Sequence, residues 1–395
     1  MPVLLQINEC LNFSTGKIAQ QIGDNAILNG WDSYIAYSAR EPKVPSQSTI
    51  IKIGSQLNSY IHYAENLFFD REGLSSRIAT KMLVKQIQEI SPDIIQLHNI
   101  HDHWLNYKIL FEYLNKTDIK VVWTFHDCWA FTGHCFHFVT KGCERWKTEC
   151  HDCPLRREYP KSFSDRSCQN FELKKNLFTA NKNLTIVACS EWMANLVRQS
   201  FLKENRIEVI RNGIDLNIFR PIGEKIKGGK FHILAVSNVW NKEKGYYDIM
   251  KLRDILPAEY VITTVGLTAG QLKELPEGII GIQRTQNVQE MVGLYSSADV
   301  LINPTYADTF PTINIEALAC DIPVITYRTG GSPEIIDKKT GIIVEQGDIR
   351  QLENAIRTLK DNPMEPGACR ERAVSHFDKN ERFSDYIRLY NNIIG

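Results

Sequence analysis

Two acidic residues flank a Phe-Pro-Thr step in the segment "ADTFPTINIEALAC": Asp308, and Glu316 after seven intervening residues. The pattern predicts a helix from about Thr312, and the free N–H groups and dipole of its first turn suit a phosphate. Pro311 fits at that helix start, where no N–H is needed. Glu316 would lie about one turn into the helix and could accept hydrogen bonds from a ribose, with Asp308 nearer a transferred group.

A glycine turn follows the next predicted strand. "PVITYR" is followed by Thr329-Gly330-Gly331-Ser332, and Pro333-Glu334 would begin another helix. Two helix starts and two carboxylates would then converge on one volume, which suits a nucleotide sugar. Taken singly, each acid is more simply a helix cap or a solvated helix residue. Their combination within one strand–helix unit favours a binding site.

The N-terminal half places polar residues at the ends of apolar strands. His98 follows "PDIIQL", His126 follows "KVVWTF" and Ser190 follows "LTIVAC". In an open parallel sheet, ligands bind at the carboxyl ends of the strands. We therefore expect these side chains near a site. A lone histidine is otherwise more often a satisfied structural residue.

Four of the ten cysteines are clustered. Cys135, Cys143, Cys150 and Cys153 are separated by seven, six and two residues, with His134, His137 and His151 nearby. A tetrahedral structural zinc would clamp this segment, and with four protein ligands it would have no catalytic position. One or two disulfides, or four reduced thiols, are the alternatives. A cytosolic setting favours zinc.

Composition excludes several classes of protein. With 43% hydrophobic and 23% charged residues, the chain is typical of folded globular proteins. Forty-six basic and 46 acidic residues leave no net charge, so nothing indicates a nucleic-acid partner. "MPVLLQINEC" has no basic lead-in and too short an apolar run for a secretory signal, so we expect a cytoplasmic protein.

The elements that position these residues alternate between strand and helix in two successive series. At 395 residues, two domains are expected. The fold class predicted is α/β, with two doubly wound Rossmann-like domains facing each other. The ranges expected are 1–222 with a Cys-rich insertion near 131–170, 223–377, and a final helix in 378–395 that packs back on the first domain. A Lys/Gly-rich linker would occupy 223–230.

These motifs resemble the retaining GT-B glycosyltransferases of family 4, the glycogen synthase-like group. "DTFPTINIEALACDIPVITYRTGGSPEII" is similar to that group's donor-site signature. "INECLNFSTGKIA", "DIIQLHNIHDHWLN", "VVWTFHDCWAFTGHC", "CERWKTECHDCP" and "RNGIDLNIFRP" resemble a bacterial subset that builds exopolysaccharides, capsules and O-antigens. The resemblance runs from about Val3 to Asp337.

The resemblance implies roles for individual residues. Asp308 would lie by the donor sugar, Glu316 would bind the ribose, and Lys244 in "NVWNKEKGYYD" would pair with the diphosphate. His126 would lie against the donor sugar, for positioning and charge stabilisation. Further donor-site residues would be Gly16, Phe310, Pro311, Thr312, Gly330 and Gly331. His98 and Asn99, in the family's loop "HNIHDHW", would be on the acceptor side rather than bind a metal.

Three positions depart from the family pattern. Asp308 stands where Glu is usual, and Asp321 stands where Gly is usual. The Arg that commonly accompanies the Lys is missing, with Ser237-Asn238-Val239 in its place, so Lys242 is a candidate substitute.

The predicted function is the transfer of a sugar from a UDP- or GDP-sugar to a saccharide acceptor, with retention of the anomeric configuration. The acceptor would be lipid-linked, and the reaction would belong to bacterial surface polysaccharide synthesis. No Asp-x-Asp pair is present to hold a divalent ion on a diphosphate, so catalysis would need no metal. Aromatic and basic residues of the insertion, from Trp129 to Lys161, either contact the inner membrane or form core and solvated surface. The alternatives are a nucleotide-sugar epimerase of the same fold and a non-catalytic nucleotide-sugar-binding subunit.

Overall fold

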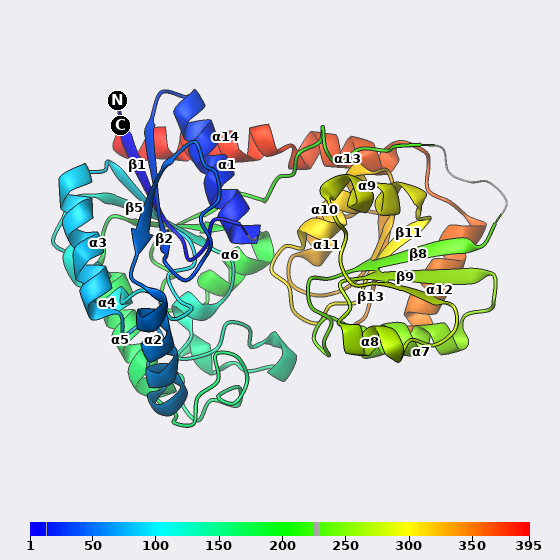
Figure 1. Cartoon of the computed structure of the whole chain (residues 1–395), viewed down its shortest axis with the longest axis horizontal. Helices are drawn as coiled ribbons and strands as arrows, with labels where there is room; N and C mark the ends of the chain where they lie inside the picture. Colours follow the sequence, from blue (N-terminus) through cyan, green and yellow to red (C-terminus); the bar gives the residue numbers. More distant parts are fainter. Residues whose placement is uncertain (13, 224–228) are drawn as a thin grey trace. The chain divides into compact units, whose positions relative to one another are not determined.

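In the computed structural model, the chain folds into two parallel sheets that are flanked by helices (Figure 1). The structure describes residues 1–12, 14–223 and 229–395. These residues divide into two compact units, one of Met1–Ile210 with Phe383–Gly395 and one of Arg211–Arg382. The prediction of an α/β fold with two doubly wound units is confirmed.

The first unit is built on a seven-stranded sheet in the order β3-β2-β1-β4-β5-β6-β7, with every neighbouring pair parallel. Its strands are β1 (Val3–Ile7), β2 (Asp32–Ser38), β3 (Thr49–Ile53), β4 (Ile94–Leu97), β5 (Lys120–Phe125), β6 (Leu184–Ala188) and β7 (Arg206–Val209). The central strands β4 and β6 are buried at every residue, because helices cover both faces of the sheet.

The helices of this unit connect successive strands. They are α1 (Ser14–Leu28), α2 (Gln56–Phe69), α3 (Arg77–Ile90), α4 (Tyr107–Leu114), α5 (Ser167–Ala180) and α6 (Glu191–Val197), with short 3-10 turns η1 (Trp129–Phe131), η2 (Val139–Lys141) and η3 (Arg145–Lys147). The 3-10 turns carry the Cys-rich insertion between β5 and α5.

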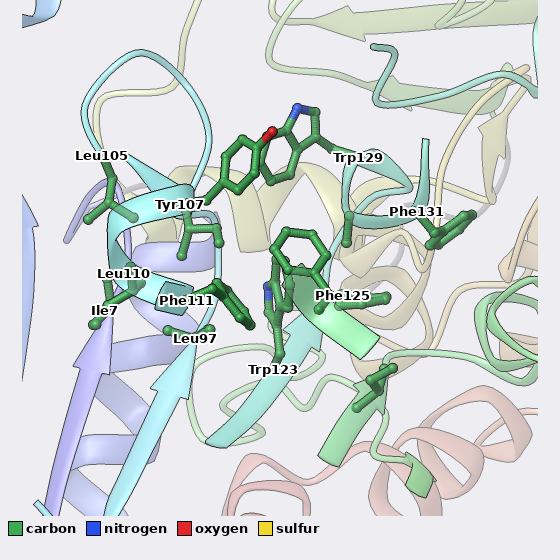
Figure 2. Packing of buried hydrophobic residues seen from close by; sticks show 14 of the residues in the cluster. Ile7, Leu97, Leu105, Tyr107, Leu110, Phe111, Trp123, Phe125, Trp129 and Phe131 are labelled. Atoms are coloured by element: carbon green, nitrogen blue, oxygen red, sulfur yellow. The ribbon is translucent and has the colours of Figure 1, made fainter. Parts of the chain in front are cut away.

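Aromatic rings fill the core on one face of this sheet (Figure 2). The ring of Trp123, from β5, lies 5.6 Å from that of Phe111 and 5.0 Å from that of Phe125. Tyr107 meets Trp129 edge-on at 5.5 Å. The insertion therefore begins inside the core, because Trp129 is itself buried.

The second unit has a six-stranded parallel sheet in the order β10-β9-β8-β11-β12-β13. Its strands are β8 (Phe231–Val236), β9 (Tyr260–Val265), β10 (Ile279–Ile282), β11 (Val300–Asn303), β12 (Val324–Tyr327) and β13 (Gly341–Val344). Its helices are α7 (Tyr246–Ile255), α8 (Ala269–Lys273), α9 (Val288–Ser297), α10 (Thr312–Ala319), α11 (Ser332–Ile335), α12 (Ile349–Asp361) and α13 (Ala368–Phe377).

Both sheets reverse their winding beside their first strand, between β1 and β4 and between β8 and β11. Loops that follow these strands diverge there, which leaves room for a ligand at the carboxyl edge. Asn8 and His98 follow β1 and β4, and Ser237 and Pro304 follow β8 and β11. The sequence-predicted residues therefore lie where doubly wound folds bind ligands.

The boundary between the units lies earlier than the sequence suggested. Residues 211–222, expected in the first domain, pack with the second unit. The guanidinium group of Arg370 donates to the carbonyls of Leu216 and Phe219, at 2.9 and 2.6 Å. Lys379 Nζ donates to Asp215 Oδ2 at 2.6 Å. Most of the expected linker, residues 224–228, lies outside the described residues.

The last helix, α14 (Lys379–Ile394), contributes its residues from Phe383 onward to the first unit. Tyr386 and Tyr390 pack in a cluster that includes Leu4 of β1, and the Tyr390 hydroxyl donates to Gln96 Oε1 at 2.9 Å. Among the described residues, no helix is both long and apolar enough to cross a membrane.

Candidate active site

In the second unit, Lys244 and Asp308 form an ion pair. Lys244 immediately precedes Gly245 and α7, and Asp308 follows β11. Lys244 Nζ lies 2.9 Å from Asp308 Oδ2 and 3.2 Å from the carbonyl oxygen of Ala307. Both side chains are partly exposed, so the pair can meet a ligand. The structure thus brings together two of the three residues predicted to act in catalysis.

Glycines permit the close backbone contacts around this pair. Gly330 has φ +52°, and a Cβ there would lie 1.7 Å from the carbonyl oxygen of Asp308. Gly245 has φ +76°, and its Cβ would lie 2.2 Å from the carbonyl oxygen of Pro304. Any other residue at these positions would be strained and would displace the loop that holds Asp308.

The turn after β12 differs from the sequence interpretation at Gly331. The family resemblance implied that Gly331 belongs to the donor site, but its N–H donates to the carbonyl of Thr309 at 3.1 Å. Its role is to tie the turn to the loop before α10. Phe310, expected to contact the donor, is buried with its ring 6.0 Å from that of Phe377, so it anchors that loop.

The start of α10 has the features that suit an anion. Pro311 is the N-cap residue with extended backbone (φ −68°, ψ 113°), and no side chain caps the helix. Thr312, the first helical residue, is partly exposed. The first-turn N–H groups of such a helix carry the positive end of the dipole.

Tyr295 of α9 orients Glu316. The Tyr295 hydroxyl donates to Glu316 Oε2 at 2.8 Å, and the tyrosine is fully buried. Burial and the neighbouring carboxylate raise the pKa of Tyr295 well above its ordinary value, so the hydroxyl remains a donor. The sequence analysis missed Tyr295, and nothing in its local pattern distinguishes it from a core tyrosine.

The proposed substitute for the missing family arginine receives no support from its position. Lys242 is exposed, whereas Lys244 is half-buried against Asp308. A cation in the second unit that the sequence analysis missed is Arg211, whose Nη2 lies 3.2 Å from Glu334 Oε2. Arg211 lies in the segment that we had placed in the other domain.

In the first unit, His98 and His126 form a stacked pair at the ends of β4 and β5. Their rings lie 5.4 Å apart at 17°, and His98 Nδ1 lies 3.1 Å from His126 Nε2. His98 Nε2 lies 3.1 Å from Gln6 Oε1, which accepts because Gln6 Nε2 donates to the Ala19 carbonyl. With neutral rings, His98 therefore donates from Nε2, and His126 donates from Nε2 to His98.

Burial keeps both rings neutral. It lowers the pKa of His126 to about 4, although Asp127 opposes the shift, and it lowers the pKa of His98 well below the ordinary value with His126 adding to the effect. His126 at neutral pH is therefore a hydrogen-bonding group and carries no charge. Both roles predicted for His126, positioning and charge stabilisation, would therefore have to act through hydrogen bonds of a neutral ring.

The other titratable residues of "HNIHDHW", His101, Asp102 and His103, each have a charged partner. His101 Nε2 lies 2.8 Å from Asp127 Oδ2, and this carboxylate raises the pKa of His101 against the lowering effect of burial. Although burial acts in the opposite direction, His101 and other neighbours hold the pKa of Asp127 at about 2. Asp127 directly follows His126 in the sequence, but its pairing with His101 appears only in the structure.

Asp102 and His103 have left-handed backbones held by one buried acid. Their φ values are +81° and +67°, and Glu72 Oε1 accepts from both backbone N–H groups, at 2.7 and 3.0 Å. The Asp102 carboxylate is bound by Arg40, at 3.1 Å, and by the Tyr159 hydroxyl. The loop thus presents a polar cluster on the first unit.

Gly16 and Asn99 have structural contacts of their own. Gly16 lies within α1 rather than in a loop, and a Cβ there would come 2.4 Å from the Leu11 carbonyl carbon, so the glycine serves helix–loop packing. The expected approach of a ligand's phosphate to Gly16 has no support from this position. The Asn99 backbone N–H donates to Asn8 Oδ1 at 3.2 Å and joins the loops after β1 and β4.

Only one described group has three ligating atoms within 4.8 Å of one another: His62, Glu72 and His103. Several of its ligand atoms already have partners. His62 Nε2 accepts from the Gly73 N–H at 3.0 Å, Glu72 Oε1 accepts from the N–H groups of Asp102 and His103, and Glu72 Oε2 forms an ion pair with His103 Nδ1. Burial lowers the pKa of His62 to about 4. We interpret the group as a structural hydrogen-bond network.

Two family models together match most of the chain. Residues 27–218 match "Glycosyltransferase Family 4", and residues 230–362 match "Glycosyl transferases group 1". The chain belongs to glycosyltransferase family 4. It is 24% identical over 323 residues to the putative colanic acid biosynthesis glycosyl transferase WcaC of Escherichia coli K12, covering 76% of this chain and 77% of WcaC.

Solved structures confirm the GT-B fold of this glycosyltransferase. Sucrose-phosphate synthase from Thermosynechococcus elongatus aligns with a TM-score of 0.75 at 16% identity, over 100% of this chain and 99% of the synthase. Anabaena HepE in complex with UDP aligns with a TM-score of 0.67 at 13% identity, over 99% and 100% of the two chains. These structures show the fold, and the family match makes the chain a nucleotide-sugar glycosyltransferase.

Proposed function

We propose that this enzyme transfers a sugar, with retention, from a UDP- or GDP-sugar to a lipid-linked saccharide during assembly of a bacterial surface polysaccharide. Its relative WcaC is named for colanic acid biosynthesis, and HepE was solved with UDP. The observation that carries the proposal is the ion pair of Lys244 and Asp308 between two glycine-packed loops, in the same unit as the start of α10.

The donor half of the reaction uses fixed positive groups. Lys244 and the first turn of α10 would bind the diphosphate and stabilise the charge that develops as the sugar–phosphate bond breaks. Glu316, held by Tyr295, would accept hydrogen bonds from the ribose hydroxyls. The acceptor oxygen would attack on the face that the diphosphate leaves, and no metal ion is included in this proposal.

The acceptor half uses the polar cluster of the first unit. Arg40, Asp102 and Tyr159 are partly or fully exposed and offer both donors and acceptors, as a saccharide requires. An exposed aromatic ring such as that of Tyr159 also packs against the apolar face of a sugar. His126, neutral and oriented by His98, would position a hydroxyl of the substrate.

Of the two interpretations left open for the insertion, core packing and membrane contact, the second requires a different surface. Trp129, Phe131, Phe138 and Trp146 are buried, so these aromatics form core. We place the contact instead on an apolar face of α2 and its surroundings. Its exposed residues are Leu57, Tyr60, Ile61, Phe68 and Phe69, with Phe163 beside Phe68 and Lys161 over the Phe163 ring.

Flotation with vesicles tests that surface. Phosphatidylglycerol-containing vesicles should bring up the wild-type enzyme, because apolar insertion and basic side chains act together. Phe68→Ser with Phe69→Ser should abolish flotation, and Val374→Ser, an exposed apolar residue of the second unit, should leave it unchanged. Equal flotation of all three proteins would remove this surface from the proposal.

The donor site is tested by calorimetric titration with UDP and GDP. One nucleotide should bind in the micromolar range, about −8 kcal/mol, and Glu316→Ala should weaken it at least about tenfold. Wild-type affinity in Glu316→Ala would show that the ribose lies elsewhere.

Transfer is tested with the bound nucleotide's sugars and lipid-linked acceptors, with NMR of the product anomer. A product with the donor's anomeric configuration supports the proposal, and an inverted product contradicts retention. Donor epimerisation without any acceptor would instead support the epimerase alternative. Nucleotide binding with neither transfer nor donor hydrolysis would support a non-catalytic subunit.

A further inference from the structure

Six ligand-bearing side chains line one small cavity in the Cys-rich insertion. The cavity is about 10 Å³, close to the volume of a single water-sized sphere. Its lining includes Cys135, Cys143, Cys150 and Cys153, together with His134 and His151. All four thiols are free of disulfides. Neither the catalytic geometry nor the family assignment accounts for this arrangement.

The sulfur atoms converge from three separate turns of the insertion. All four cysteine side chains line the same cavity. No three of the four sulfurs lie within 4.8 Å of one another in the described chain. A tetrahedral Zn²⁺ with Zn–S bonds of about 2.3 Å would draw them to about 3.8 Å by an inward movement of the turns.

A backbone N–H group is already directed at one of the sulfurs. The Gly133 N–H donates to Cys150 Sγ at 3.3 Å. Gly133 cannot be replaced without conflict, since its Cβ would lie 2.1 Å from the Ser167 carbonyl oxygen. Such donors stabilise thiolates and orient metal ligands.

A buried histidine beside the cavity has an atom without a partner. His134 is 2% exposed, and its Nδ1 lies 2.5 Å from Asp70 Oδ1, while Nε2 has no hydrogen-bond partner among the described residues. An unpaired buried ring nitrogen is costly. A thiolate of a metal site would satisfy it, because Nε2–H could donate to sulfur.

Positive charge is placed to balance a thiolate cluster. Lys174 of α5 is buried, with Nζ 2.6 and 3.0 Å from the carbonyls of Trp129 and Thr132, and it interacts with Cys150 and Cys135. A zinc ion with four thiolates has a net charge of about −2. The ammonium group of Lys174 would offset part of that charge.

We propose that Cys135, Cys143, Cys150 and Cys153 bind one structural Zn²⁺, with His134 as a hydrogen-bond donor to a ligating thiolate. The ion would fasten the turns η1, η2 and η3 to each other and to the start of α5. These turns lead to Tyr159, whose hydroxyl binds Asp102 of the polar cluster. The proposal does not depend on the reaction that the enzyme catalyses.

Metal content of the purified full-length enzyme is the first test. Zinc-replete expression should give about one zinc per chain, falling below about 0.2 in Cys150→Ser and in Cys143→Ser. Cys168→Ser is the matched control, because its thiol lies outside the cavity and contacts Glu149, and it should retain the metal. His134→Gln should retain zinc with weaker affinity for it.

Cobalt substitution of the wild-type enzyme covers the case in which the cysteine variants do not fold. Tetrahedral thiolate coordination should give intense visible and near-ultraviolet absorption, and a chelator should release the metal and lower Tm. The proposed site would be overturned if the wild-type enzyme contained no zinc and its four thiols reacted freely or formed disulfides. Full zinc in Cys143→Ser with none in His134→Gln would overturn the ligand set.

Discussion

Lys244 Nζ lies 2.9 Å from Asp308 Oδ2, and the carbonyl of the same Asp308 occupies the space that a Cβ of Gly330 would need. One loop thus holds the carboxylate against the lysine on one side and packs under the β12 turn on the other. Lys244 and Gly330, which are far apart in the sequence, therefore both hold Asp308 in place.

Removal of the lysine should affect chemistry more than folding. Lys244→Ala should lower kcat about 100-fold, because the leaving diphosphate loses its fixed positive charge. Lys251→Ala, an exposed lysine on α7, is the control and should keep full activity. Steady-state kinetics on both variants measures the difference. Equal kcat values would show that Lys244 does not contact the diphosphate.

The Tyr295 hydroxyl should matter for donor affinity although it is buried beneath the ribose-binding acid. Tyr295→Phe keeps the ring but frees Glu316 to rotate, so affinity for the nucleotide should fall about tenfold. Titration calorimetry measures it, with thermal unfolding as the control for folding. An unchanged Kd would mean that Glu316 is oriented without this hydrogen bond.

Two glycines offer a matched test of backbone strain. Gly330→Ala should destabilise the enzyme by about 2 kcal/mol or more, because φ is +52° and the new Cβ would collide with the Asp308 carbonyl. Gly293→Ala, in α9 with no atom within 4 Å of its Cβ, should be neutral or stabilise by up to about 1 kcal/mol. Denaturant unfolding compares them. Similar values for both would contradict the predicted contact.

Lowering the pH should destabilise the fold, because two buried histidines are held neutral in the folded chain. The pKa values of His62 and His126 fall from 6.5 to about 4 in the folded chain. As pH falls from 6.5 toward 4, the unfolded chain therefore binds more protons than the folded one. The free energy of unfolding should decrease by about 3 kcal/mol for each of these histidines.

Among the other shifted groups, Asp102 opposes this trend, because burial raises its pKa and the folded chain then takes up a proton before the unfolded one. The pKa values of His101 and His103 are raised in the folded chain, so the stabilisation that they give is already complete below pH 6.5. The pKa of Asp127 in the folded chain is about 2, so its contribution to stability is lost only below the range from pH 6.5 to 4. Urea unfolding at several pH values measures the slope, and His62→Gln should flatten it. A slope unchanged by His62→Gln would show that this ring titrates normally in the folded enzyme.

The sequence by itself determined the class of fold and the places where chemistry could occur. Strand–helix alternation and turn residues are local signals, so two doubly wound units followed from them, with His98, His126 and Asp308 at strand ends. The family motifs also assigned donor binding to Asp308 and Glu316, whose spacing lies within a single helix and its loop, and this assignment stays a prediction.

Only the tertiary structure decided which groups pair. Tyr295 with Glu316, His101 with Asp127, and Gly330 with the Asp308 carbonyl join residues whose separation in sequence carries no periodic signal. The assignment of residues 211–222 to the second unit has the same origin, since it rests on side chains such as that of Arg370, far along the chain. Non-local packing selects these partners through shape, burial and charge.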